Sequence, residues 1–233
     1  MMHLNDIAIG YGRGRVVAAN LTADLAAGML TCLIGRNGTG KSTLLRTMAA
    51  MQQPLAGSIT VDMGQPVDLH AMTPGQRARV IGIVLTERTA PGNMTVREMV
   101  AMGRTPYTGF WGRLSAMDRE IVDEALEATG TDGMANRQME ALSDGERQKV
   151  MIAKALAQQT PLIMLDEPTA FLDYPSKIST METLLRLCHE QGKTVLLSTH
   201  DLDAALKMTD RVWLMKEGAL MTGTPEELGG LVV

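Results

Sequence analysis

The chain has few of the residues that mark disulfide-rich, zinc-binding or nucleic-acid-binding proteins. Its 233 residues include only two cysteines, Cys32 and Cys188, and no spaced group of cysteines and histidines of the kind that binds zinc. Lysine and arginine number 22 against 26 aspartates and glutamates, so the net charge is −4 and the basic surplus of a dedicated nucleic-acid binder is missing. We therefore expect two reduced, buried thiols and no nucleic acid among the partners.

Long apolar runs are missing as well. A membrane-spanning helix needs about 20 apolar residues, and the best candidate here, residues 16–34, is interrupted by Asn20, Asp24 and Gly28. The first six residues also lack the basic start and apolar block of a signal peptide. We therefore expect a cytoplasmic chain that does not itself cross a membrane.

The composition is that of a folded domain. Apolar residues make up 45% of the chain and charged residues 21%, which is too apolar for disorder. Because a domain usually holds roughly 100–200 residues, we expect residues 1–233 to form a single domain.

Short apolar runs alternate with helical stretches along the chain. This order is typical of an α/β protein whose mainly parallel sheet is covered on both faces. Strands are expected at residues 29–34, 58–61, 80–85, 161–165, 194–198 and 212–215, and helices at residues 42–51, 96–102, 117–129, 143–158, 176–189 and 201–208.

Residues 103–112 break this order. They include Tyr107, Phe110 and Trp111, three of the seven aromatic residues in the chain, together with Pro106 and several glycines. We expect an irregular surface lobe here, between helices. Residues of about 90–158 are expected to form a helical subdomain inserted into the rest of the fold.

The strongest chemical signal is a glycine loop at residues 35–42, which fits the pattern G-x-x-x-x-G-K-[ST] between an expected strand and an expected helix. Glycines let backbone N–H groups approach phosphate oxygens, and the helix N-terminus adds partial positive charge. Lys41 is expected to reach the β- and γ-phosphates, and the Ser42 hydroxyl to bind Mg²⁺. The alternative is a glycine-rich turn with no ligand. The expected nucleotide-binding residues are Gly35, Asn37, Gly38, Thr39, Gly40, Lys41, Ser42 and Thr43.

A second signal is the acidic pair Asp166 and Glu167, which follows the aliphatic run of residues 162–165. Parallel sheets bind ligands at the carboxyl ends of their strands. Asp166 is therefore expected to hold Mg²⁺, and Glu167 to orient or deprotonate the attacking water. The alternative is an ordinary turn after a buried strand. The presence of the glycine loop in the same chain makes this alternative less favoured.

A third segment, Leu142-Ser143-Asp144-Gly145-Glu146, opens an expected helix. We call residues 142–146 the signature segment. Ser143 with Glu146 three residues later forms the pattern of a capping box, which explains both residues as helix-start chemistry.

Together the three segments resemble the ATP-binding subunits of ABC transporters, which have a P-loop NTPase fold. In that family the signature segment reads L-S-G-G-Q and caps the γ-phosphate of ATP bound to a second subunit. This chain keeps Ser143 and Gly145 but has Asp144 and Glu146. Two alternatives follow: their negative charge weakens ATP-driven closure, or Arg147 and Lys149 offset it. The resemblance implies ATP and Mg²⁺ as cofactors, an N-terminal antiparallel β portion, and nucleotide contacts from Ser143, Gly145 and Glu146.

Other residues match the family in order. Tyr11 lies where an aromatic residue stacks on adenine, although a tyrosine at a strand edge is the simpler alternative. Asp173 lies where the family has its dimer interface, and His200 where a histidine contacts the γ-phosphate and supports catalysis. The family has a metal-sensing glutamine where this chain has Thr86. Thr86 or the adjacent Glu87 is the candidate for that metal contact.

The region from about residue 100 to Asp118 resembles the importers of iron–siderophore complexes, haem and cobalamin. The resemblance implies a homodimer with two ATPs, two separate permease subunits, and contact with a substrate-binding protein only through them. It also implies a peripheral position on the cytoplasmic face of the inner (cell) membrane. The alternative is a non-transport ABC ATPase acting on DNA or ribosomes. Only 125 residues separate Lys41 from Asp166, too few for the long coiled coils of the DNA-acting type.

Overall fold

The structure is a computed structural model that describes residues 1–12, 15–85, 93–170 and 172–232. It contains two sheets. The first is antiparallel, with strand order β2-β1-β4-β5, and the second has strand order β10-β9-β3-β8-β7-β6. In the second sheet β9, β3, β8, β7 and β6 run parallel, and only β10 is antiparallel to its neighbour. This arrangement confirms the predicted α/β class with an N-terminal antiparallel portion.

The strands are β1 (Met2–Tyr11), β2 (Arg15–Leu25), β3 (Leu30–Ile34), β4 (Ala56–Asp62), β5 (Pro66–Asp68), β6 (Ile81–Val84), β7 (Leu162–Asp166), β8 (Thr194–Ser198), β9 (Arg211–Lys216) and β10 (Ala219–Gly223). The α-helices are α1 (Lys41–Met48), α2 (Pro74–Arg77), α3 (Val96–Ala101), α4 (Ala116–Ala128), α5 (Asp144–Ala157), α6 (Tyr174–Gln191), α7 (Leu202–Lys207) and α8 (Pro225–Val232). The strand expected at residues 58–61 is β4, and it belongs to the antiparallel sheet rather than to the parallel one.

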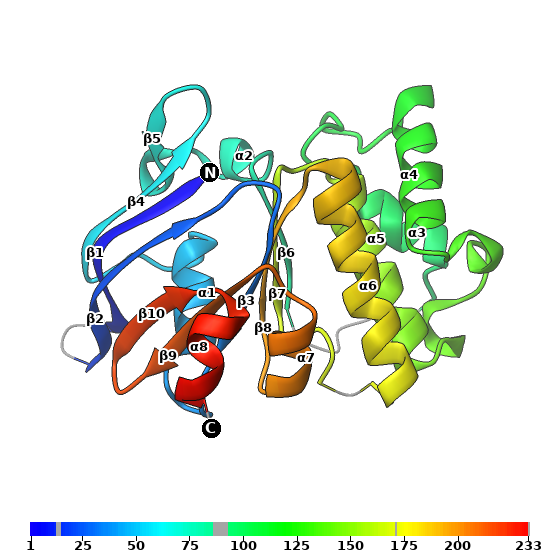
Figure 1. The fold of residues 1–233 in the computed structure, drawn as a ribbon. Coiled ribbons are helices and arrows are strands. Elements are labelled where there is room, and N and C mark those ends of the chain that lie inside the picture. Colours follow the sequence, from blue (N-terminus) through cyan, green and yellow to red (C-terminus); the bar gives the residue numbers. More distant parts are fainter. Residues whose placement is uncertain (13–14, 86–92, 171, 233) are drawn as a thin grey trace.

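The six-stranded sheet separates two hydrophobic cores. Successive side chains of a strand point to opposite faces, so Ile163 and Leu165 of β7 join one core while Leu162 and Met164 join the other. The second core lies against the antiparallel sheet and α1, and the first lies under α3, α4, α5 and α6 (Figure 1). The strands β3, β7 and β8 are buried along their whole length because both faces are covered.

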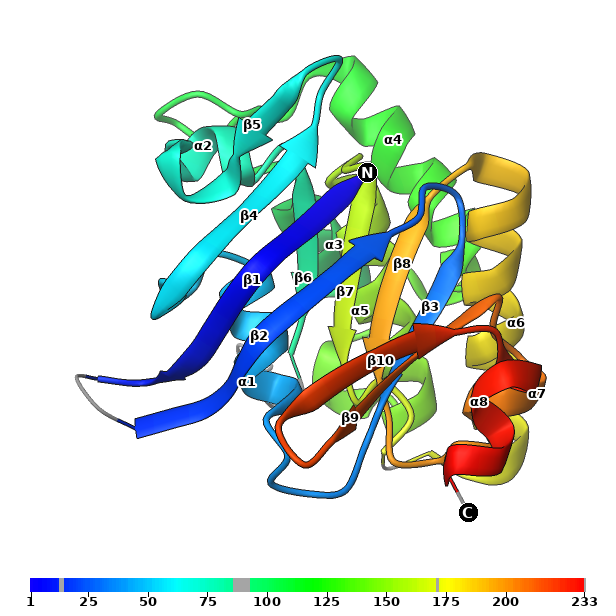
Figure 2. The ribbon, with the colours of Figure 1, turned by 60° about the vertical axis from the view of Figure 1, so that its left-hand side comes forward.

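The loop between α3 and α4 is largely irregular, as the sequence predicts. A single 3₁₀ turn at Met102–Arg104 leads into turns and bends up to the start of α4. Figure 2 shows α4 at the top of the molecule, on the opposite side from α8 and the C-terminus. None of the described helices combines the length and the apolar character that crossing a bilayer requires.

The two cysteines are buried and free, as expected. Burial raises the pKa of the Cys188 thiol to about 12, and it raises that of Cys32 further. Neither thiol is therefore a reactive thiolate near neutral pH.

Candidate nucleotide-binding site

The glycine loop joins the end of β3 to the start of α1, and its backbone admits only glycine at two positions. Gly35 has a φ of 154° and Gly40 a φ of 106°, in the left-handed region that side chains disfavour. A Cβ on Gly35 would lie 2.5 Å from the Met215 carbonyl oxygen, and a Cβ on Gly40 would lie 2.6 Å from Val17. The loop therefore packs closely against its surroundings while leaving its outer side to a ligand.

The N-terminus of α1 suits an anion. Gly40 is its N-cap residue and supplies no side-chain acceptor for the N–H groups of the first turn. The Lys41 ammonium is buried and donates to the carbonyl oxygens of Gly35, at 2.8 Å, and Arg36, at 3.3 Å. Burial lowers the pKa of Lys41, and this outweighs the opposite effect of Glu167 and Asp166. The lysine thus lies against the inner side of the loop.

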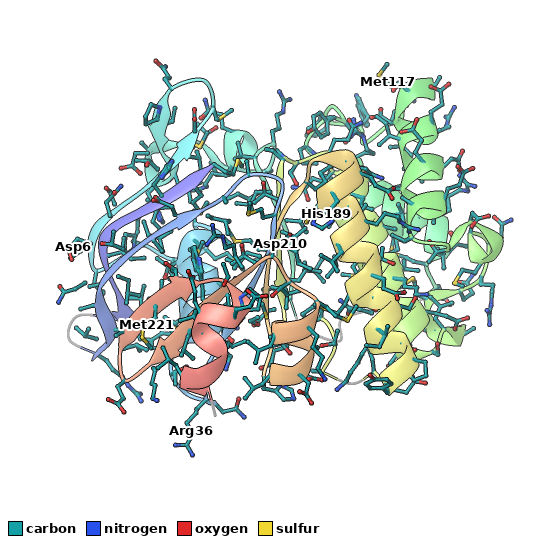
Figure 3. All side chains as sticks on the ribbon, viewed as in Figure 1. Asp6, Arg36, Met117, His189, Asp210 and Met221 are labelled. Atoms are coloured by element: carbon teal, nitrogen blue, oxygen red, sulfur yellow. The ribbon has the colours of Figure 1, made fainter. Side chains whose placement is uncertain are left out.

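The outer residues of the loop border a cavity of about 570 Å³. Gly35, Arg36 and Asn37 line it together with His200, so the loop and the histidine share one hollow. Arg36 itself projects from the lower edge of the molecule in Figure 3. Within the loop, Thr39 donates its hydroxyl to the Arg36 carbonyl oxygen at 2.9 Å, which closes the turn around Gly38.

Hydroxyl and carboxylate oxygens meet where β7 and β8 end. Ser42 donates to Asp166 Oδ1 at 3.3 Å, and Ser198 donates to the same oxygen at 2.7 Å. Hard oxygen donors of this kind suit Mg²⁺, which usually keeps several waters and phosphate oxygens and takes only one or two ligands from the protein. The described residues hold no group of three or more His, Cys, Asp or Glu side chains that could bind a metal. Ser42 and Asp166 therefore fit a Mg²⁺ ion that arrives with a nucleotide.

Glu167 and His200 face each other beside this cluster. His200 Nδ1 lies 3.4 Å from Glu167 Oε2. Glu167 has a φ of 48°, and its backbone N–H donates to the Ser198 hydroxyl at 2.9 Å, which holds this turn after β7. A strained backbone at a polar strand end is typical of functional sites. The carboxylate can orient a water molecule, and the half-exposed imidazole can contact a phosphate.

Tyr11 reaches the first turn of α1 from the antiparallel sheet. Its hydroxyl is hydrogen-bonded to Thr43 Oγ1 at 2.7 Å, although the two residues are 32 positions apart. Tyr11 is also the last residue of β1 and its side chain is half exposed. The tyrosine therefore lies at the end of an inner strand and next to the helix that follows the glycine loop.

The signature segment forms a capping box at the start of α5. The Ser143 hydroxyl accepts from the Glu146 N–H at 3.3 Å, and Glu146 Oε2 accepts from the Ser143 N–H at 2.8 Å. These hydrogen bonds from Ser143 hold the pKa of Glu146 below its usual range. The capping box predicted for Ser143 and Glu146 is therefore confirmed. It is compatible with an additional contact to a ligand at the N-terminus of α5.

Arginines pair with the acidic residues that set this segment apart from L-S-G-G-Q. Arg147 lies 3.4 Å from Asp144, as the sequence allowed, and Arg137 lies 3.2 Å from Glu146. Arg137 was not predicted, because nothing in its sequence context marks it. Ser198 was also missed, and its only signal is a hydroxyl at the end of an apolar strand.

The glycine loop and the signature segment lie on opposite sides of the six-stranded sheet within one chain. Leu44, Leu45 and Met48 of α1 belong to one core, and Val150 and Ile152 of α5 belong to the other. A ligand held by the loop is therefore not enclosed by the same chain's α5.

Of the remaining predicted positions, one is described by the structure and two are not. Asp173 is the N-cap of α6, where its carboxylate accepts from the Ser176 N–H at 3.2 Å. Thr86 and Glu87 lie outside the described residues.

The fold and this site define a nucleotide-hydrolysing α/β cassette. A sequence profile described as "ABC transporter" matches residues 18–170, more than half of the chain. This chain belongs to the ABC transporter family, as an ATP-binding subunit that hydrolyses ATP.

Relatives of known assignment agree. The chain is 40% identical over 215 residues to the iron(3+)-hydroxamate import ATP-binding protein of Bacillus subtilis, covering 92% of this chain and 78% of that protein. It is 38% identical over 223 residues to the ferric enterobactin transport ATP-binding protein of Escherichia coli, covering 95% of this chain and 81% of that protein. The predicted resemblance to importers of iron–siderophore complexes is confirmed by these relatives.

A solved structure extends the comparison to an assembled state. The dimeric post-hydrolysis state of an ATP-binding cassette, bound to ADP and Pi, matches with a TM-score of 0.82 and 27% identity. The match covers 97% of this chain and 99% of that one.

Proposed function

We propose that this chain hydrolyses Mg·ATP to energise a membrane importer of the iron–siderophore, haem or cobalamin type. The observation that carries the proposal is the convergence of Lys41, Ser42, Asp166, Glu167 and His200 at the carboxyl ends of three adjacent strands. The substrate class rests on the two import proteins from Bacillus subtilis and Escherichia coli.

Binding of the nucleotide falls to the glycine loop and its neighbours. Backbone N–H groups of residues 35–42 cradle the phosphates, and the Lys41 ammonium turns from the loop carbonyls to the β- and γ-phosphates. Thr43 continues the loop's contacts from the first turn of α1. Tyr11 stacks on adenine, a placement supported by its hydrogen bond to Thr43.

Residues at the ends of β7 and β8 carry out ATP hydrolysis, together with Ser42. Ser42 and Asp166 hold Mg²⁺, which neutralises charge on the phosphate oxygens when bound. Glu167 accepts a proton from the attacking water, and His200 contacts the γ-phosphate. Thr86 or Glu87 is proposed as a further contact to the metal.

A second copy of the chain completes the site. Because the glycine loop and α5 lie on opposite sides of the sheet, Ser143, Gly145 and Glu146 of one copy are free to meet ATP held by its twin. Two-fold symmetry then places two ATPs between two chains, with Asp173 at the interface. The dimeric cassette with ADP and Pi supports this assembly.

Two permease subunits carry the substrate across the membrane, and the dimer docks on their cytoplasmic side as a peripheral component. A substrate-binding protein acts on the permease and meets this chain only indirectly. Residues of about 90–158 form the subdomain that receives the permease, near Thr86 and the lobe of residues 103–112. The helix α3 precedes the lobe and continues into the turn at Met102–Arg104.

The test combines turnover with co-purification. Lys41→Ala is expected to lower ATP turnover about a hundredfold or more, because the phosphates lose their only buried cation from α1. The exposed Lys207→Ala is the control and keeps wild-type turnover. A tagged chain extracted in detergent is expected to carry a polytopic membrane protein with it. Recovery with ribosomes or DNA in its place would contradict the transport role and favour the non-transport alternative.

A further inference from the structure

The neighbours of His200 hold it in place, since the histidine side chain itself is half exposed. Thr199 is buried, and its N–H donates to the Leu33 carbonyl oxygen at 3.1 Å, which ties it to β3. On the other side, the Asp201 N–H donates to Thr199 Oγ1 at 3.0 Å. The direction of the imidazole therefore depends on where Thr199 and Asp201 are fixed.

Asp201 is fixed by an ion pair to another helix. Lys177 Nζ donates to Asp201 Oδ2 at 3.2 Å, and about a quarter of each side chain is exposed. The other carboxylate oxygen accepts from the Ala204 N–H at 3.2 Å, which makes Asp201 the N-cap of α7. One carboxylate thus joins α7 and the residue next to His200 to α6.

The position of Lys177 makes this pair more than a surface contact. Lys177 lies in the first turns of α6, where its N–H donates to the Asp173 carbonyl oxygen at 3.0 Å. A cation is disfavoured near a helix N-terminus, and the first turn of α6 contains no acidic residue. The Asp173 carboxylate caps this end of α6, and Asp201 places a second negative charge directly against the Lys177 ammonium. Burial raises the pKa of Asp201, but its hydrogen bonds from Ala204 and Lys177 outweigh burial and keep the pKa below its usual range.

The same turn of α6 touches the signature segment. A Cβ on Gly145 would lie 3.0 Å from Ser176 Oγ and 3.3 Å from Ser176 Cβ, so the start of α5 lies directly against Ser176. Ser176 is adjacent to Lys177, and its N–H is capped by Asp173. One helical turn therefore contacts the segment that meets the twin's ATP and the segment that holds this chain's His200.

We propose that Lys177 and Asp201 are positioning residues that link the signature segment to His200 through the first turn of α6. When α5 closes on the ATP of the second copy, it pushes on Ser176, and the Lys177–Asp201 pair carries that displacement to His200 and its partner Glu167. Each chain would then hydrolyse its own ATP only after its signature segment has engaged the other. This inference rests on the proposed dimeric ATPase.

The test measures kcat and KM for Mg·ATP in the purified full chain. Lys177→Met is expected to lower kcat about tenfold with KM within about twofold of wild type, because neither residue of the pair touches the glycine loop. Asp201→Asn keeps an N-cap acceptor for α7 while removing the charge, and it is expected to show the same loss. The double variant is expected to lose no more than either single variant, since both remove one interaction.

Two further variants separate positioning from folding. Lys177→Arg restores the charge and the hydrogen bond and is expected to keep kcat within about twofold of wild type. Lys207→Met removes the exposed pair to Asp203 on the same helix α7 and is expected to change nothing.

Three results would overturn the inference: wild-type kcat in Lys177→Met, an equal loss in Lys207→Met, or losses that multiply in the double variant. The proposed function fails separately, through absence of ATP turnover by the wild-type chain, and that result would overturn the inference with it.

Discussion

Two residues at the ends of parallel strands have backbone conformations that fit their place in the site. Gly35 follows β3 with a φ of 154°, and Glu167 follows β7 with a φ of 48°. For a residue with a side chain, the left-handed conformation costs on the order of 1–3 kcal/mol unless the surroundings enforce it. Around Glu167 they do so, through the hydrogen bond from its N–H to Ser198. The turn therefore fixes the backbone position from which the Glu167 side chain extends.

The loop glycines differ in how much they tolerate a side chain. Gly35→Ala is expected to abolish measurable ATP binding and to lower the melting temperature, because its Cβ would lie 2.5 Å from the Met215 carbonyl oxygen. Gly38→Ala is the matched control in the same loop. Its φ is 83°, but nothing lies within 4 Å of the added Cβ. We therefore expect Gly38→Ala to lower the free energy of unfolding by only about 1 kcal/mol and to keep measurable ATP binding. Equal ATP affinity of the two variants, measured by titration calorimetry, would contradict the packing assigned to Gly35.

At the scale of residues, the sequence predicted the residues with chemical groups for a nucleotide site, but it did not predict the side chains that hydrogen-bond or ion-pair with them. The glycine loop, Asp166 and Glu167 have fixed spacing and context along the chain. Ser198 reaches Asp166 across 32 positions and Arg137 reaches Glu146 from a 3₁₀-turn region, so both contacts exist only after folding. The roles of the site residues remain predictions.

At the scale of elements, a buried ion pair anchors the lobe of residues 103–112 to the helices. Arg104 donates to Asp118 at 2.8 Å and to the Ala157 carbonyl oxygen at 2.8 Å, and its guanidinium carbon lies 4.1 Å from the centre of the Tyr107 ring. Asp118 also completes the capping box of α4 with Ser115. The start of the lobe, the start of α4 and the end of α5 therefore meet at one guanidinium group.

Removing Asp118 should weaken this junction. Asp118→Ala is expected to lower the free energy of unfolding by about 3 kcal/mol at neutral pH, because Arg104 is left buried without its counterion. Asp123→Ala on the same helix breaks the exposed pair with Arg97 and is expected to cost about 0.5 kcal/mol or less. Chemical denaturation measures both, and equal effects would contradict the junction.

The same junction predicts a pH dependence. Hydrogen bonds from Ser115, followed by that from Arg104, lower the pKa of Asp118 from 3.8 to about 2. A carboxylate with a depressed pKa stabilises the fold above its unfolded pKa and loses that effect as the pH falls through the folded one. The difference between wild type and Asp118→Ala should therefore be full above about pH 4 and shrink toward pH 2.

The sequence predicted the buried parallel strands and capped helices well and the antiparallel sheet poorly. Runs such as residues 162–165 are apolar throughout because both faces of the sheet are covered, and this signal is unambiguous. In β1 and β2 the pairing shifts register at several points, so no clean alternation of apolar and polar residues survives in the sequence. The family resemblance, rather than residue pattern, supplied this portion of the fold.

For the whole molecule, the glycine loop and the lobe lie at opposite edges. Arg36 of the glycine loop lies at the lower edge in Figure 3, and Met117, just beyond the lobe, at the upper edge. Phe110 and Trp111 are 96% and 82% exposed and form an edge-to-face pair with ring centres 5.5 Å apart. Two exposed aromatic rings in edge-to-face contact suit binding to a protein partner.

Replacing this pair should separate transport from ATP binding. The double variant Phe110→Ser/Trp111→Ser is expected to lower substrate uptake at least about tenfold in cells or proteoliposomes, while ATP affinity stays at the wild-type value. Met63→Ser, which replaces another exposed apolar residue, after β4, is the control and should leave uptake unchanged. Parallel loss of uptake and ATP affinity would count against a docking role for the lobe.

The central claim is that two copies share each ATP. Glu167→Gln removes the proton acceptor but leaves the glycine loop and the signature segment intact, so bound ATP should persist between the chains. The decisive measurement is the molar mass of this variant by light scattering, with and without saturating Mg·ATP, beside Lys41→Ala as the non-binding control. The account predicts a stable dimer for Glu167→Gln with Mg·ATP and monomers in every other case. A Glu167→Gln chain that binds ATP fully yet stays monomeric, alone and with its membrane partner, would contradict it.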